Sequence, residues 1–137
     1  MGGCLESLYD ILTITRYEDE KAVCEKYGLF PNIEEWKEKI LFIETCEEKP
    51  TPEQFEKEIT ILKEKGVFDV VNGVLVGKPQ DEVYYDEYKD ILVNVVNHFK
   101  LPIVYNVNFG HATPRCALQY GAMVKVDMKK KKIYLDN

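Results

Sequence analysis

The sequence predicts an α/β fold with a largely parallel central sheet and a C-terminal β-hairpin. Residues 39–45 (KILFIET) contain four successive apolar side chains, which is typical of a strand covered on both faces of a parallel sheet. Strand-like and helix-like runs alternate from residue 39 to residue 107, an order that favours right-handed parallel crossovers. Two short strand-like runs, 122–127 and 133–136, then indicate an antiparallel pair.

Short helices are expected before the first strand. Apolar residues recur at helical spacing and predict an amphipathic helix from Leu5 to Ile14. Residues 16–26 are highly charged and predict a surface segment with a weak helix. A further short helix is expected to contain Ile33, Trp36 and Ile40, with the indole ring of Trp36 packed in the core as an anchor.

A helix with clear start and stop signals follows the first strand. Thr51 is expected to be its N-cap, and Pro52 then occupies the first helical position. Gln54 has the side chain and the spacing to close a capping box with the threonine. The apolar residues of the next turns form one stripe, and Gly66 predicts the end of the helix.

The second half of the chain predicts one more crossover and the hairpin. Residues 69–77 are rich in valine and predict the second strand. A helix is expected from Asp81 to Phe99, with acidic residues in its first turn, where the helix dipole favours them. Residues 101–107 predict the third strand, and the lysine-rich residues 128–132 predict the solvated turn that closes the hairpin.

Length and charge indicate one domain over residues 1–137. A chain of 137 residues can bury a core without staples, and it contains no internal repeat and no low-complexity linker. With 18 basic and 24 acidic residues, the net charge is -6, which disfavours nucleic-acid polymers and anionic membranes as partners. No apolar run approaches the roughly 18 residues of a membrane span, and the start lacks the pattern of a signal peptide.

The cysteines and histidines argue against a disulfide framework and a metal site. Four cysteines, at positions 4, 24, 46 and 116, lack metal-binding or CxxC spacing, so we expect reduced thiols and a cytoplasmic location. Two histidines are a weak ligand set, and we expect no metal and no cofactor. His98 is interpreted as a surface or capping residue, whereas His111 lies on a bent segment between Gly110 and Pro114.

Polar side chains gather at the carboxyl edge of the predicted sheet. Glu44 ends the first strand, Gln80 and Asp81 follow the second, and His111 follows the third. Ligands of parallel sheets collect at this edge. A carboxylate that accepts the Nδ1 proton of a histidine leaves Nε2 to act as a general base. The pattern therefore predicts a carboxylate beside the imidazole, and it leaves open which carboxylate this is.

The residue pattern supplies no clear nucleophile. The single serine, Ser7, lies within a helical pattern rather than on a strand-to-helix elbow, and we interpret it as a polar helix residue. Cys46 and Cys116 are close in sequence to Glu44 and His111, which leaves a thiol enzyme open. Buried cysteines, however, are more often small hydrophobic residues.

Four segments, taken in order, resemble those of a known family. They are GGCLESL at 2–8, LFIET at 41–45 with two glutamates after it, GVLVGKP at 73–79, and NFGHATP at 108–114. The whole chain resembles the C-terminal half of the LD-carboxypeptidase and microcin C immunity protein family of serine peptidases. This resemblance covers all 137 residues.

The resemblance implies a fold and a division of roles between two domains. The C-terminal domain is expected to have three layers, β/β/α, of the swivelling type, and to supply a glutamate and a histidine that map by motif onto Glu44 and His111. A flavodoxin-like N-terminal domain, which supplies the serine and the oxyanion hole in this family, is expected to be absent from the chain. Ser7 is not that serine, and Cys4 stands where the family usually has asparagine.

The function that the resemblance implies is amide hydrolysis, with this chain inactive by itself. Family members either release D-alanine from cell-wall peptides or cleave peptidyl or aminoacyl nucleotides, and Glu47, Glu48 and residues 84–88 favour the second branch. The expected partners are the serine-bearing N-terminal domain, a small peptide or aminoacyl-nucleotide substrate, and a second copy in a homodimer. The alternative is a non-catalytic binding or assembly module that retains the fold.

Overall fold

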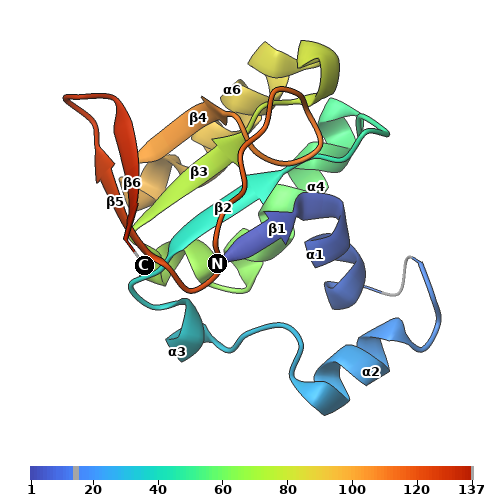
Figure 1. Ribbon diagram of the computed structural model, residues 1–137. Helices are drawn as coiled ribbons and strands as arrows, with labels where there is room; N and C mark the ends of the chain where they lie inside the picture. Colours follow the sequence, from blue (N-terminus) through green and yellow to red (C-terminus); the bar gives the residue numbers. More distant parts are fainter. Residues whose placement is uncertain (14–15, 137) are drawn as a thin grey trace.

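A four-stranded parallel sheet forms the centre of the computed structural model, which describes residues 1–13 and 16–136 (Figure 1). Its strands lie side by side in chain order, and every neighbouring pair is parallel. They are β1 (Gly2–Cys4), β2 (Ile40–Glu44), β3 (Gly73–Gly77) and β4 (Ile103–Val107). An antiparallel hairpin of β5 (Met123–Asp127) and β6 (Lys132–Asp136) follows, as predicted.

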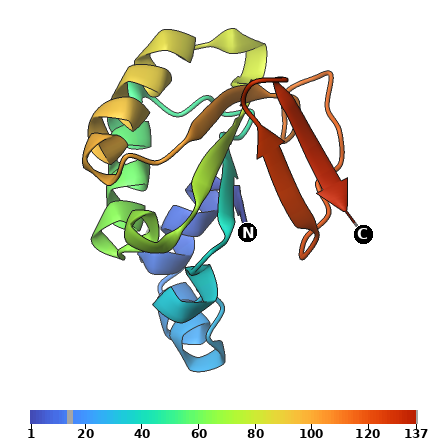
Figure 2. The same cartoon turned by 90° about the vertical axis from the view of Figure 1, so that its left-hand side faces the viewer.

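The molecule has three layers (Figure 2). Helices α4 (Pro52–Glu64) and α6 (Tyr85–Val96) cover one face of the parallel sheet, and the hairpin lies on the other side. The long segment 108–122 joins β4 to the hairpin along that second side, where the ring of Tyr120 meets the ring of Phe42 edge-on, 5.1 Å between ring centres. The predicted α/β fold with β/β/α layers is confirmed.

The most buried strand, β3, lies inside the sheet. All residues of β3 are buried, because β2 and β4 flank it and layers cover both of its faces. Strand β1 was not predicted, since Gly2, Gly3 and Cys4 carry no apolar alternation. Its pairing with β2 places Cys4 beside Glu44 at the carboxyl edge.

The helices before β2 are short, as predicted, but their boundaries differ. Helix α1 covers Leu5–Leu12, and Ile14, at the predicted helix end, lies outside the described residues. Helix α2 (Glu20–Tyr27) occupies the charged segment. Helix α3 covers only Ile33–Trp36, and Ile40 belongs to β2, because Glu38 has a left-handed φ of 60° that ends the helical path.

Helix α4 begins and ends where the sequence predicts. The side chain of Thr51 accepts a hydrogen bond from the backbone N–H of Gln54 at 3.3 Å, and Gly66 follows the last turn with a φ of 75°. The expected capping box is not formed. The Gln54 amide instead donates to the buried carboxylate of Glu58 at 2.9 Å.

Two predicted boundaries between β2 and β4 are wrong. The predicted strand 69–77 begins only at Gly73, because α5 (Val67–Val70) makes a helical turn that buries Val67 and Phe68. The predicted helix from Asp81 begins only at Tyr85, because left-handed backbone precedes it at Asp81, Glu82 and Tyr84. Two 3₁₀ turns flank α6, η1 (Gln80–Glu82) and η2 (Asn97–Phe99).

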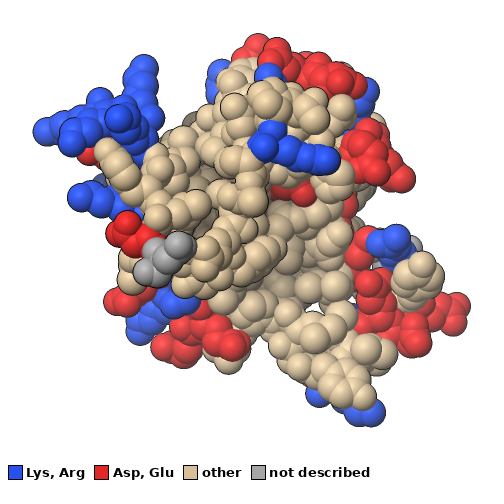
Figure 3. All heavy atoms as spheres, viewed as in Figure 1, with Lys and Arg blue, Asp and Glu red and all other residues tan. Residues whose placement is uncertain are grey.

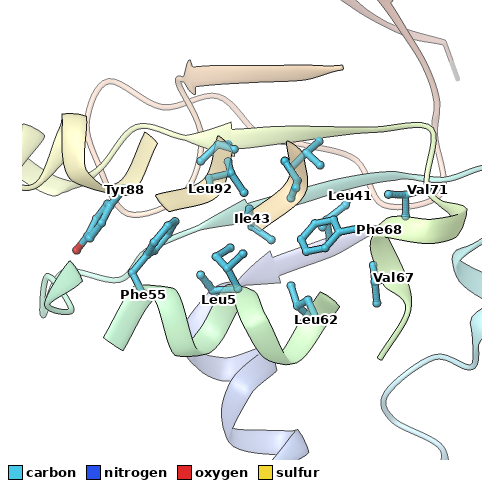
Figure 4. Packing of buried hydrophobic residues seen from close by; sticks show 14 of the residues in the cluster. Leu5, Leu41, Ile43, Phe55, Leu62, Val67, Phe68, Val71, Tyr88 and Leu92 are labelled. Atoms are coloured by element: carbon cyan, nitrogen blue, oxygen red, sulfur yellow. The ribbon is translucent and has the colours of Figure 1, made fainter. Parts of the chain in front are cut away.

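The core lies between the sheet and the helical layer. The ring of Phe55 on α4 stacks on the ring of Tyr88 on α6, with ring centres 4.3 Å apart (Figure 4). Leu41 and Ile43 point into the same core from β2. Trp36 is 1% exposed, which confirms its predicted role as a core anchor.

Charged side chains cluster on the outer surface (Figure 3). The largest group of basic side chains in this view lies at the tip of the hairpin, where residues 128–131 form the exposed turn and Lys132, the last residue of the predicted turn, begins β6. None of the helices in residues 1–13 and 16–136 is both long enough and apolar enough to cross a membrane.

Replacing Phe55 by alanine removes one ring of the stacked pair. We expect Phe55→Ala to lower the free energy of unfolding by about 3–5 kcal/mol in urea denaturation, because the substitution leaves a cavity in the core. The matched control is Val93→Ala on α6, where the side chain is 47% exposed and the loss should stay within about 0.5 kcal/mol. Equal losses in the two variants would contradict the packing described here.

Candidate active site

The carboxyl ends of the parallel strands meet at one edge of the sheet. Glu44 is the last residue of β2, and Gly77, the last residue of β3, lies beside Val107 at the end of β4. The chain after β4 turns back across this edge before it runs to the hairpin (Figure 1). This return brings His111 to the end of β2.

Glu44 and His111 lie in direct contact. Glu44 Oε2 is 2.8 Å from His111 Nδ1 and also accepts the backbone N–H of His111 at 3.1 Å. An ionised carboxylate only accepts hydrogen bonds, so Nδ1 carries the proton and donates it. Because the Glu44 side chain is 8% exposed, its oxygen is held by these two bonds in a dry environment. The ring orientation is therefore fixed from the Nδ1 side.

Two glycines leave the space that Glu44 needs. A Cβ atom on Gly110 would lie 2.5 Å from Glu44 Oε2, and the φ of 90° there is one that side-chain-bearing residues rarely adopt. A Cβ atom on Gly77 would lie 2.6 Å from the Cβ of Glu44. The carboxylate is thus enclosed by backbone from the neighbouring strand and from the histidine segment.

A second carboxylate meets the other side of the imidazole ring. Glu47 Oε2 lies 3.2 Å from His111 Nε2, in the turn that follows β2. Its side chain is 69% exposed, and that of His111 is 39% exposed. Sequence reasoning did not predict this contact, because a glutamate on an exposed turn has no pattern that points to a particular partner.

The surroundings raise the pKa of His111. The hydrogen bond to Glu44 is the largest cause, and the negative charges of Glu44, Glu47 and Glu6 add to it, while partial burial acts in the opposite direction. The folded protein therefore favours the imidazolium. This contribution to stability is complete below the unfolded-state pKa of about 6.5, and it is lost as the pH rises through the higher pKa of the folded state.

Glu6 on α1 holds the segment that follows Glu44. Its Oε1 accepts the backbone N–H of Cys46 at 2.9 Å, and its Oε2 accepts the Cys4 thiol at 3.2 Å. Burial raises the pKa of the Cys4 thiol to about 11, so the thiol stays protonated and can donate. The sequence did not predict this role.

Gln80 and Asp81 lie at the same edge of the sheet, as predicted, but not against the imidazole. Asp81 instead forms an ion pair with Lys49 at 2.6 Å. Gln80 and Asp81 line a cavity of about 250 Å³ together with Ala112 and Thr113 of the histidine segment. Within the described residues, the carboxylates that contact the ring of His111 are those of Glu44 and Glu47.

None of the candidate nucleophiles in the described residues has the properties of a nucleophile paired with the imidazole. Burial raises the pKa of Cys46 to about 12, which is opposite to what a thiolate nucleophile needs. The Cys116 thiol donates to the carbonyl of Asn108 at 2.9 Å, and Ser7 is an exposed residue of α1. No hydrogen bond joins any of the three to His111 in the described part of the chain, which disfavours the thiol enzyme.

Metal ligands are not grouped in this structure. Among residues 1–13 and 16–136, no three side chains of histidine, cysteine, aspartate or glutamate lie together in a way that would hold a metal ion.

Comparison with known proteins places the chain in a family. The family model of the LD-carboxypeptidase C-terminal domain matches residues 1–126. The chain belongs to this family. The match confirms the resemblance found in the four sequence segments.

Solved and curated relatives of this LD-carboxypeptidase-type domain are longer proteins. An MccF-like protein from Streptococcus pneumoniae, solved in complex with AMP, is 50% identical over 99% of this chain, with a TM-score of 0.95. The muramoyltetrapeptide carboxypeptidase from Oxalobacter formigenes, at 22% identity over 98% of the chain and a TM-score of 0.66, shares the fold. A Treponema pallidum (strain Nichols) protein that carries the name carboxypeptidase is 33% identical over 99 residues, or 69% of this chain. The chain spans 39% of the S. pneumoniae chain, 42% of the O. formigenes chain and 28% of the T. pallidum protein.

A methyl group at Gly110 should separate the carboxylate from the imidazole. We expect Gly110→Ala to lower the pKa of His111 toward about 6.5, measured by NMR titration of the ring, because the new Cβ collides with Glu44 Oε2. Gly121→Ala is the matched control, since its φ of 80° is similarly left-handed and its Cβ would meet nothing within 4 Å. A His111 pKa that is unchanged in Gly110→Ala, or lowered equally in both variants, would contradict this geometry.

Proposed function

We propose that this chain supplies the general base and its orienting carboxylate to a serine peptidase that hydrolyses an amide bond. The observation that carries the proposal is the 2.8 Å contact between Glu44 Oε2 and His111 Nδ1. This contact fixes the tautomer that keeps Nε2 for proton transfer. Membership in the LD-carboxypeptidase C-terminal domain family supports the assignment to peptidases.

In the proposed reaction, another domain supplies the nucleophilic serine. The longer relatives have a region that this chain does not span and that can contain such a domain. The serine hydroxyl gives its proton to His111 Nε2 while its oxygen attacks the carbonyl carbon of the amide. Glu44 stabilises the imidazolium that forms, which agrees with the raised pKa of His111. The imidazolium then protonates the departing amine nitrogen, and a water molecule repeats the sequence to release the acid and restore the serine.

The substrate class that we favour is a peptidyl or aminoacyl nucleotide rather than a cell-wall peptide. The S. pneumoniae MccF-like protein is solved in complex with AMP, and this chain is 50% identical to it. This identity to a relative that binds an adenine nucleotide supports our choice.

We further propose that the 137 residues are inactive by themselves, because a base without a nucleophile cannot complete the reaction. Joining them in one polypeptide to the serine-bearing part of the S. pneumoniae relative should produce hydrolysis of an aminoacyl sulfamoyl adenylate. The chain alone should cleave neither this compound nor an LD-tetrapeptide. Turnover by the chain alone, measured by product release, would contradict the proposal.

The joined protein also tests the role of Glu44. Glu44→Gln should lower kcat by about 10²- to 10⁴-fold, because a neutral amide no longer stabilises the imidazolium. The control is Glu56→Gln, an exposed position on α4 that should leave kcat unchanged. An activity that survives Glu44→Gln intact would remove Glu44 from the mechanism.

A non-catalytic binding or assembly module is the second candidate, and one observation favours it. A groove of about 510 Å³ lies between the parallel sheet and the hairpin, lined mainly by apolar side chains such as Leu75 and Leu118. Along it, Tyr120 is 66% exposed and Met123 is 73% exposed. Light scattering of the purified chain separates the candidates, because a stable monomer at high concentration would count against an assembly role.

A further inference from the structure

The imidazole of His111 has a carboxylate on each of its two ring nitrogens. Glu44 Oε2 lies 2.8 Å from Nδ1, and Glu47 Oε2 lies 3.2 Å from Nε2. The Nδ1 contact is a hydrogen bond, and the Nε2 contact becomes an ion pair when the ring is protonated, so both carboxylates favour the imidazolium. The nitrogen that would accept the proton in the proposed reaction therefore already lies beside a negative charge.

The two carboxylates are held very differently. The Glu44 side chain is 8% exposed, accepts a second hydrogen bond from the backbone of His111, and is enclosed by Gly77 and Gly110. The Glu47 side chain is 69% exposed and belongs to the turn after β2. Exposed ion pairs are weak, since water solvates both partners and salt screens their charges. Glu47 can thus leave the ring at little energetic expense, whereas Glu44 cannot.

We propose that Glu47 is a displaceable cap on His111 Nε2, which holds the ring charged until a nucleophile takes its place. This inference rests on the function proposed above, in which Nε2 accepts the proton of a serine hydroxyl. The serine and Glu47 compete for the same atom, so Glu47 is a positioning residue. Its charge also adds to the larger effect of Glu44 in raising the pH above which the base becomes free.

The exchange involves one proton and no change at Glu44. The imidazolium loses its Nε2 proton to water, Glu47 turns into solvent, and the free electron pair of Nε2 accepts a hydrogen bond from the incoming hydroxyl. Nδ1 keeps its proton and its bond to Glu44 throughout. The orientation of the ring is therefore retained while its second nitrogen changes partner.

Charged and titratable groups around the ring come from several elements. Glu44 comes from β2, Glu47 from the turn after it, and Glu6 from α1, and all three charges favour the imidazolium. Arg115 lies on the histidine segment itself, with its guanidinium 3.4 Å from the carbonyl oxygen of His111. Of these groups in the described part of the chain, Glu47 is the one in contact with Nε2.

The titration of the two histidine rings in the full chain tests this cap. In NMR titrations we expect Glu47→Gln to lower the pKa of His111 by about 0.2 to 0.7, in keeping with the strength of an exposed ion pair. Glu48→Gln is the matched control, because it removes the same charge from the neighbouring exposed residue, which is not among the groups that raise the pKa of His111. The ring signals of His98, in η2, serve as the internal reference for both variants.

The proposal that Glu47 caps Nε2 is contradicted if Glu47→Gln leaves the pKa of His111 unchanged, or if Glu48→Gln lowers that pKa equally. Glu44→Gln in the same titration separates this inference from the proposed function. A pKa that falls with Glu44→Gln but not with Glu47→Gln removes the cap and leaves the Glu44–His111 pair intact. A pKa that responds to Glu47→Gln but not to Glu44→Gln supports the contact at Nε2 and counts against the proposed base.

Discussion

A buried carboxylate at the end of β2 is the constraint on which the candidate site depends. A charge removed from water is costly unless hydrogen bonds compensate it. Glu44 obtains two such bonds, from the ring and from the backbone N–H of His111. Both come from one residue on a segment far away in the sequence, so the chain after β4 must return to the end of β2. Gly77 and Gly110 allow this return, because any side chain there would meet Glu44.

The same constraint gives the imidazole two unequal sides. Nδ1 faces a buried partner within the domain, whereas Nε2 faces Glu47 on an exposed turn. A general base whose nucleophile lies on another domain needs a fixed hydrogen bond at Nδ1 and an Nε2 that can exchange its partner. The S. pneumoniae relative, of which this chain spans 39%, has room for such a domain. Glu6 stabilises the arrangement by accepting a hydrogen bond from the backbone N–H of Cys46, next to Glu47 in the turn after β2.

The parts of the structure that follow from local pattern could be predicted from the sequence. Four apolar residues in β2 and the cap at Thr51 are local signals, and both elements lie where expected. Strand β1 has glycines in place of a pattern, and it exists only because β2 offers it a pairing edge. The helix expected from Asp81 starts late because that loop adopts left-handed backbone, a property of packing rather than of composition. The predicted topology places Glu44 and His111 at the same edge of the sheet. The contact of Glu47 with Nε2 could not be predicted, because it depends on the position of a side chain on an exposed turn.

The tautomer of neutral His111 is the most direct test of the central claim, which is that Glu44 orients the ring through Nδ1. Nitrogen-15 NMR of the imidazole ring distinguishes the two neutral tautomers above the pKa of His111. The geometry predicts that Nδ1 keeps the proton and that Nε2 is unprotonated, with Glu44→Gln weakening this preference. A neutral ring that instead carries its proton on Nε2 would contradict the account, because that nitrogen could not then accept a proton from a nucleophile.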